Sequence, residues 1–262
     1  MLDITYPPVI VTAKLLFKFL GQRFQLSGTE HVPRKGGALL AINHTGYVDF
    51  IYGGLAANPS KRLVRFMIKR EMMDKPGVGH LLRSFHHIRV DRESGVQSMK
   101  DALAYLKAGE VVGIYPEATI SRSFEIKELK SGAARIAADA GVPLIPVIVW
   151  GAHRLMTKDH PKDFSRSRKT IAVSVGPPMY PTGEDIAADT AQLRAEMQRL
   201  LDETIAAYPD DEKAPGSWWT PARFGGSAPT PEVAERLDRE ELAARAAKRR
   251  AKAAEKKGSS TS

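Results

Sequence analysis

The chain has 262 residues and no cysteine. This absence excludes disulfide bonds, zinc sites built on thiolates and a cysteine nucleophile, and it is compatible with a reducing compartment. We also expect no secretory leader, because the first residues, MLDI, carry no basic region ahead of an apolar stretch.

Long hydrophobic runs are absent as well. The best candidate, residues 9–20, contains Lys14 and Lys18 and is shorter than the roughly 20 apolar residues that span a bilayer. We predict an amphipathic helix that lies in the membrane interface, where its lysines suit anionic headgroups. The alternative is a helix packed on the domain core.

The formal charge of +9 is concentrated near the C-terminus. Residues 245–257 contain seven lysines and arginines and one glutamate, a net +6, which leaves +3 for the remainder. No recognisable nucleic-acid module accompanies this segment, so we predict no nucleic-acid partner. We expect a solvated helix here, with attraction to anionic lipid as the alternative.

Apolar runs and helical patterns alternate along the chain. Alternation of this kind predicts an α/β fold with a largely parallel central sheet flanked by helices on both faces. We expect the interfacial helix in residues 1–24, the α/β domain in 25–208, and a linker with a charged, partly disordered helical tail in 209–262. The strands are predicted at 24–28, 38–43, 64–68, 86–90, 111–115, 144–149 and 170–175, and the helices at 48–57, 76–84, 95–107, 131–140, 185–207 and 231–252.

A polar cluster follows the apolar run of residues 38–42. It contains Asn43, His44 and, five residues after the histidine, Asp49. Five residues on an ideal helix turn through roughly 500°, so the two side chains meet only if His44 lies in the strand-to-helix turn and Asp49 in the first helical turn. Asp49 then accepts from one imidazole nitrogen and leaves the other free to take a proton.

A second polar cluster follows the apolar run of residues 111–115 and contains Glu117. The carboxyl end of a buried strand is where α/β folds usually place their sites. Two strands that each end in such a loop therefore predict one shared cleft.

These residues resemble a known family. Asn43, His44 and Asp49, followed by the string YPEAT at 115–119, are similar to the motifs of glycerolipid acyltransferases typified by 1-acylglycerol-3-phosphate acyltransferase. Two weaker blocks, at residues 85–92 and 142–147, also match, and all four blocks come in the order that is typical of the family. The resemblance covers roughly residues 25 to 180.

The resemblance implies acyl transfer from acyl-CoA or acyl-carrier protein to the hydroxyl of a lysophospholipid, without a metal, a cofactor or a covalent acyl-enzyme. His44 is the expected general base and Asp49 its orienting partner, as in serine-protease triads. We expect the backbone N–H groups of Ala118 and Thr119 to stabilise the oxyanion. The expected location is the cytoplasmic face of the cell membrane, bound peripherally to anionic lipids.

An anionic acceptor also requires basic groups. We predict a phosphate site at consecutive strand ends, where the N-terminus of the helix that begins near Gly132 adds backbone donors. Asn43 is expected to fix the turn beside the acceptor, and Glu117 to contact the acceptor or brace its loop. The basic candidates are Lys69, Arg92, Arg122, Lys127 and Lys130.

The chain departs from the family pattern at two positions. Ala118 replaces a glycine, and Ile120 replaces the arginine that the family uses on the acceptor's phosphate; Arg122 is the candidate substitute. The alternatives are therefore an acyltransferase for another acceptor, such as a glycolipid or lysophosphatidylinositol, or a non-catalytic lipid-binding protein on the same scaffold. An apolar groove for the acyl chain is expected near Phe50, Ile51, Met67, Met72 and Met73.

Overall fold

The computed structural model describes residues 5–91 and 95–258, with side chains as far as residue 247. The chain divides into two compact units. The first comprises Met1–Ser121 and Ile126–Lys213, and the second comprises Arg122–Glu125 and Ala214–Ser262.

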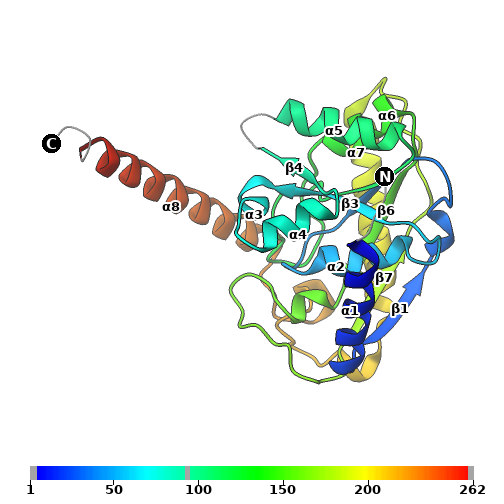
Figure 1. Ribbon diagram of the computed structural model, residues 1–262. Coiled ribbons are helices and arrows are strands. Elements are labelled where there is room, and N and C mark those ends of the chain that lie inside the picture. The colour runs from blue at the N-terminus through cyan, green and yellow to red at the C-terminus, as the bar shows by residue number, and fades with distance from the viewer. Residues whose placement is uncertain (1–4, 92–94, 259–262) are drawn as a thin grey trace. The chain divides into compact units, whose positions relative to one another are not determined.

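The first unit is built on a seven-stranded sheet with the order β1-β7-β6-β2-β5-β3-β4 (Figure 1). Every neighbouring pair is parallel except β6 and β7, which run antiparallel. This confirms the predicted α/β class and its largely parallel sheet. The strands are β1 (Arg23–Ser27), β2 (Ala38–Ile42), β3 (Val64–Lys69), β4 (Ile88–Val90), β5 (Val111–Ile114), β6 (Leu144–Trp150) and β7 (Thr170–Val175).

Helices cover both faces of this sheet (Figure 1). One face carries α5 (Gly95–Lys107), α6 (Gly132–Ala140) and α7 (Ile186–Ala206), which also contact one another. The other face packs against α1 (Tyr6–Phe19) and α2 (Asp49–Gly53). Two short helices, α3 (Arg70–Met73) and α4 (Val78–Ser84), lie between β3 and β4 along the chain.

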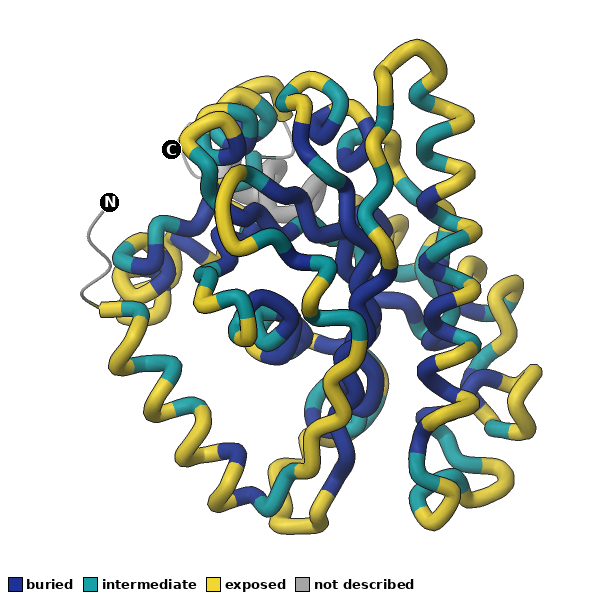
Figure 2. Tube along the Cα trace, turned by 90° about the vertical axis from the view of Figure 1, so that its right-hand side faces the viewer, coloured by how far each residue is buried: buried dark blue, intermediate teal, exposed yellow. Residues whose placement is uncertain are grey.

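The central strands β2, β6 and β7 are buried at every residue, as strands covered on both faces must be (Figure 2). At the edge of the sheet, all five residues of β1 are exposed. The core beneath α1 and α2 combines aliphatic side chains from the central strands, among them Leu40, Ile42 and Val147, with the rings of Phe17, Tyr52 and Phe66.

Helix α1 is anchored to the first unit at both ends. The Tyr6 hydroxyl donates to the carbonyl oxygen of Val64 (3.0 Å), and Phe17 is buried with its ring stacked on Tyr52. The rest of the helix is exposed along most of its length (Figure 2). The sequence left open an interfacial helix or a core helix. In the structure α1 packs on the core through Phe17 and leaves its other side exposed, and its place in a membrane interface stays a prediction. Across the described residues, no helix combines the length and hydrophobicity that crossing a bilayer requires.

Most element boundaries agree with the sequence to within two residues. Two differences have local causes. The strand predicted at 86–90 begins only at Ile88, because His86 adopts a positive φ of 55°. The sequence also missed α3, which is separated from α4 by Gly77 at φ 73°.

The second unit contains α8 (Pro231–Gly258), which starts at the predicted proline and is helical where partial disorder was expected. It also contains the segment 122–125. Arg122 is 9% exposed and forms ion pairs with Asp238 and with Glu241 (2.9 Å to the latter), while Phe124 packs edge-on against Trp218. Residues 122–125 are therefore held by residues that lie about a hundred positions later in the chain.

We expect Arg122→Gln to destabilise the second unit, because it leaves Asp238 and Glu241 facing each other without their cation. Removing one partner of a largely buried pair costs roughly 1–3 kcal/mol. A urea titration followed by tryptophan fluorescence, to which Trp218 contributes, should show a transition at lower urea concentration.

The matched control is Arg239→Gln, which removes an exposed ion pair with Glu235 on the same helix. Exposed pairs contribute little, so its transition should coincide with that of the parent protein. Equal shifts in the two variants would contradict the structural role assigned to Arg122.

Candidate active site

His44 and Asp49 occupy the positions that their spacing predicts. His44 lies in the turn after β2, and Asp49 is the first residue of α2. The Nδ1 atom of His44 is 3.1 Å from Oδ2 of Asp49, and the His44 side chain is about 20% exposed while the carboxylate is fully buried. A carboxylate at Nδ1 favours the tautomer with its proton on that nitrogen, which leaves Nε2 as the basic atom.

Asp49 also organises the turn itself. Its Oδ2 atom accepts the backbone N–H groups of Thr45 and Gly46, both at 2.7 Å. Its other oxygen, Oδ1, is buried and accepts no hydrogen bond from any described residue. One carboxylate oxygen thus fixes both the backbone of the turn and the histidine edge.

The outer side of the turn is held by residues that the sequence did not single out. The carbonyl oxygen of Met156 accepts the Tyr47 N–H (2.9 Å), and the Thr157 hydroxyl donates to the Thr45 carbonyl oxygen (2.6 Å). A Cβ atom at Gly46 would lie 2.9 Å from that Met156 oxygen, so only glycine fits. No motif marks Met156 or Thr157, because their contribution is a backbone contact and a single hydroxyl.

Asn43 belongs to the sheet. Its Oδ1 accepts the N–H of Val149 on β6 (2.7 Å), and its Nδ2 donates to the carbonyl oxygen of the same residue (3.2 Å). The side chain is 1% exposed. The amide therefore extends the β2–β6 hydrogen bonding past Ile42, which agrees with a role in fixing the turn and contradicts a contact with substrate.

Glu117 joins the second loop to the first. Its Oε1 accepts the backbone N–H of His44 (2.9 Å), its Oε2 accepts that of Lys127 (3.2 Å), and the Ser121 N–H donates to the His44 carbonyl oxygen (2.7 Å). The two loops therefore meet at one edge of the sheet, as predicted. Burial raises the pKa of Glu117 to about 8, since desolvation outweighs the two N–H bonds that favour the carboxylate.

The loop after Glu117 does not supply the expected oxyanion donors. The Ala118 N–H donates to the Tyr115 carbonyl oxygen (3.1 Å), and the Thr119 N–H donates to that of Glu117 (2.8 Å). Both N–H groups are committed within the loop, so the structure contradicts this expectation. Ala118 also holds φ at 60°, a value that glycine adopts without strain, and Ile120 is buried.

The predicted basic residues have different surroundings. Lys69, the last residue of β3, and Lys130, beside the Glu117 loop, are exposed, while the Lys127 ammonium donates to the Thr119 hydroxyl (2.8 Å). Gly132 is the first residue of α6, as expected. Arg122 forms its ion pairs with carboxylates of α8, which argues against the substitute role on the acceptor phosphate. Arg92 lies outside the described residues.

Comparison with known proteins identifies the family. Residues 23–150 match the family model described as Acyltransferase. The chain is 31% identical over 179 residues to the 1-acyl-sn-glycerol-3-phosphate acyltransferase of Bacillus subtilis, an alignment that spans 65% of this chain and 84% of that protein. This chain belongs to the glycerolipid acyltransferase family.

Two further relatives agree. The protein of the same name from Pseudomonas aeruginosa is 26% identical to this acyltransferase, over 71% of this chain and 70% of that protein. The crystal structure of the 1-acyl-sn-glycerophosphate acyltransferase PlsC from Thermotoga maritima shares the fold, with a TM-score of 0.65 at 21% identity, covering 78% of this chain and 81% of that one. The predicted family and the predicted O-acyltransferase class are thereby confirmed.

The acyltransferase has an apolar cavity of about 110 Å³ between α1, α2 and β3. Phe17 of α1, Phe66 of β3 and two predicted groove residues, Phe50 and Ile51, line it. Met67, Met72 and Met73 are not among the described residues that do so.

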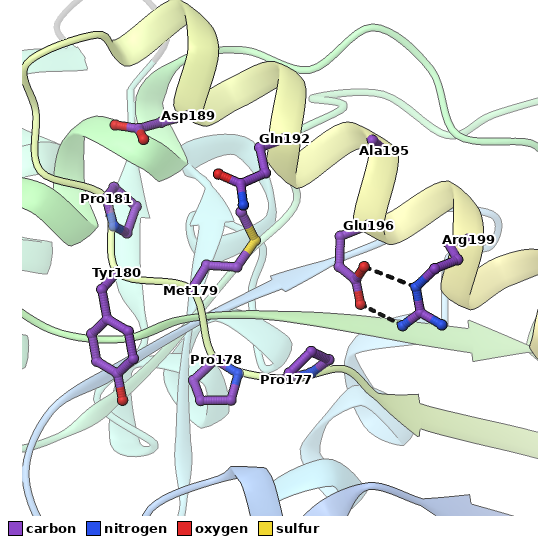
Figure 3. Close-up of a pocket in the computed structure, with 10 residues that line it drawn as sticks. All are labelled: Pro177, Pro178, Met179, Tyr180, Pro181, Asp189, Gln192, Ala195, Glu196 and Arg199. Atoms are coloured by element: carbon purple, nitrogen blue, oxygen red, sulfur yellow. Dashed lines mark hydrogen bonds and ion pairs between the residues drawn. The ribbon is translucent and has the colours of Figure 1, made fainter.

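A larger cavity of about 560 Å³ lies between α7 and the segment after β7 (Figure 3). Its residue Met179 pairs with Leu144, at the start of β6, whereas His44 follows the carboxyl end of the parallel strand β2. This cavity therefore lies at the amino-terminal end of β6, whereas His44 lies at the carboxyl-terminal end of β2. Despite its larger volume, it is not the site that contains His44.

The buried Glu117 makes stability depend on pH. Its pKa in the folded chain, about 8, exceeds the ordinary value of 4.5, so the folded state binds this proton more tightly. Its contribution to the free energy of unfolding is full below about pH 4.5 and declines as the pH rises towards about 8. We expect Glu117→Gln to remove this decline, as measured by urea titrations between about pH 5 and 9.

The control for this experiment is Glu128→Gln. Its carboxylate is 91% exposed and lies near Arg194 at the protein surface. That variant should keep the pH dependence of the parent protein. If the stability of the Glu117→Gln variant also follows the parent curve, Glu117 does not hold a proton in this range.

Proposed function

We propose that this acyltransferase moves an acyl group from acyl-CoA or acyl-carrier protein to the hydroxyl of a lysoglycerophospholipid, with 1-acylglycerol-3-phosphate and its sn-2 hydroxyl as the preferred acceptor. The observation that carries the proposal is the pair formed by His44 and Asp49, with one edge of the imidazole bound to a buried carboxylate and the ring partly open to solvent. The names of the relatives support the acceptor.

In the proposed reaction, Nε2 of His44 takes the proton of the acceptor hydroxyl while the hydroxyl oxygen bonds to the thioester carbonyl carbon. The carbon–sulfur bond then breaks, and the departing thiolate takes the proton back from the imidazolium. Asp49 stabilises the imidazolium while it exists, as aspartate does in serine-protease triads. The products are an ester and a free thiol, and no covalent acyl-enzyme forms.

The apolar cavity beside α2 is the proposed entrance for the acyl chain. The rings of Phe17, Phe50 and Phe66, from three different elements, line it. Phe50 directly follows Asp49, the first residue of α2, which connects this cavity to the His44 turn. Each methylene that enters such a cavity contributes about 0.8 kcal/mol to binding. Chain binding therefore draws the thioester towards the turn that carries His44.

A second candidate function keeps the reaction and changes the acceptor. Ile120 is buried, and Arg122 is committed to Asp238 and Glu241, so neither provides the family's arginine contact to phosphate. This favours an acceptor with another headgroup, such as a glycolipid or lysophosphatidylinositol. A non-catalytic lipid-binding protein is the alternative from another class, and it would consume no thioester.

We expect His44→Ala to fold normally and to lower acyl transfer by about 10²–10⁴-fold, the usual contribution of a general base. The measurement is lysolipid-dependent release of free thiol from acyl-CoA, repeated with acceptors of different headgroup. His80→Ala, which alters an exposed histidine of α4, should retain full activity. Full activity of the His44→Ala variant would reject His44 as the base, and a headgroup other than phosphate giving the highest rate would select the second candidate.

The acyltransferase is also proposed to bind the cytoplasmic face of the membrane through α1 and the neighbouring strand β1. Their outer surfaces expose large apolar side chains at 37–72% of full accessibility, next to Lys14 and Lys18. Apolar side chains ringed by lysines suit the interface of anionic bilayers. The residues are Val11, Leu15, Leu16, Phe19, Phe24 and Leu26.

We expect the double variant Leu15→Glu/Phe19→Glu to lose sedimentation with anionic liposomes, because it places two carboxylates on the docking surface. Both side chains are more than 60% exposed, so the fold should tolerate the change. Val96→Glu, at a similarly exposed position on α5 on the other face of the sheet, is the matched control and should still sediment. Undiminished binding of the double variant would move the docking surface elsewhere.

A further inference from the structure

Tyr115 covers one face of the His44 ring. The two ring centroids are 4.4 Å apart and the ring planes are inclined by 30°, a stacked arrangement. Phe66 also lies against the tyrosine, with centroids 6.4 Å apart and planes inclined by 15°. Tyr115 therefore contacts both the imidazole and Phe66, a buried residue of the hydrophobic core.

The hydroxyl of Tyr115 takes no part in this contact. It is buried, and it makes no hydrogen bond to any residue that the structure describes. Burial raises the pKa of the phenol well above its ordinary value, so the group stays neutral. An influence of Tyr115 on His44 therefore has to pass through the face of its ring.

The other contacts of His44 leave that face uncovered. Asp49 binds the Nδ1 edge of the ring, and Glu117 and Ser121 bind the backbone N–H and carbonyl groups. Among the described residues, the titratable groups in contact with the histidine are thus Asp49 from α2, Glu117 from the loop after β5, and Tyr115, which directly follows β5. Among the described residues, the tyrosine is the ring that stacks on the face of the imidazole.

We propose that Tyr115 is a positioning residue for the acyl-transfer reaction: its ring face holds the His44 imidazole in the plane that Asp49 requires and stabilises the imidazolium that forms during transfer. A cation within about 6 Å of an aromatic centroid is attracted by the negative face of the ring. At 4.4 Å the imidazole is well within that range. This inference rests on the proposed function, since it acts through His44 as the base.

The experiment compares Tyr115→Phe with two non-aromatic variants, Tyr115→Leu and Tyr115→Met, in the full-length protein. The phenylalanine variant keeps the ring and should retain kcat within about threefold, with an unchanged or higher Tm because a buried hydroxyl without a partner is removed. The leucine and methionine variants should lower kcat about tenfold with little change in KM. The acid limb of their kcat profile should move to lower pH, because the imidazolium has lost its aromatic neighbour.

Loss of a half-buried tyrosine elsewhere is the control. Tyr105→Leu, on α5, should change neither kcat nor the position of the acid limb. Because both leucine and methionine are tested, one of them provides the comparison if the other lowers Tm to the assay temperature.

The inference is overturned if both non-aromatic variants keep the parent kcat and pH profile. It is also overturned if the phenylalanine variant is as impaired as they are, since the hydroxyl would then be the active part. Failure of the proposed function is distinguishable, because there the His44→Ala variant itself remains active. An inactive His44→Ala variant beside a fully active Tyr115→Leu variant rejects only the role of Tyr115.

Discussion

The carboxyl group of Glu117, in the loop after β5, binds the backbone of His44, in the turn after β2. Glu117 accepts the His44 N–H, and the Ser121 N–H from the same loop donates to the His44 carbonyl oxygen. These two bonds fix the backbone of His44 independently of its side chain. Because β2 and β5 are paired and parallel, both loops leave the sheet at the same edge, and the histidine is held there before any substrate arrives.

This arrangement has a cost in folding free energy. Glu117 is 4% exposed, and removing a carboxylate from water disfavours its charged form. Ala118 adds backbone strain at positive φ, and Asp49 keeps one buried oxygen without a donor among the described residues. Strained and desolvated groups persist where the surrounding structure is stable enough to hold them in place. Here the well-packed strands β2, β5 and β6 hold them. The cluster of such groups around His44 agrees with a site shaped for chemistry.

The sequence was most informative where residues close together along the chain determine how their side chains are placed. The five-residue spacing of His44 and Asp49 predicted a strand, a turn and the first turn of a helix, because no other local path brings the two side chains together. Alternating apolar and helical patterns predicted the parallel sheet, since strands covered on both faces must be apolar throughout. The wrong prediction concerns atoms rather than elements: the N–H groups of Ala118 and Thr119 bind within their loop and are not free for an oxyanion.

The sequence by itself determined the fold class, the family and the pairing of His44 with Asp49, because each is written in local spacing or in the order of motifs. Only the tertiary structure decided the partners that come from distant parts of the chain. It placed Tyr115 on the face of the imidazole, Arg122 on the carboxylates of α8, and Met156 and Thr157 against the turn. Such contacts depend on how strands pair and helices pack. The sequence contains no local spacing that predicts contacts between residues so far apart along the chain.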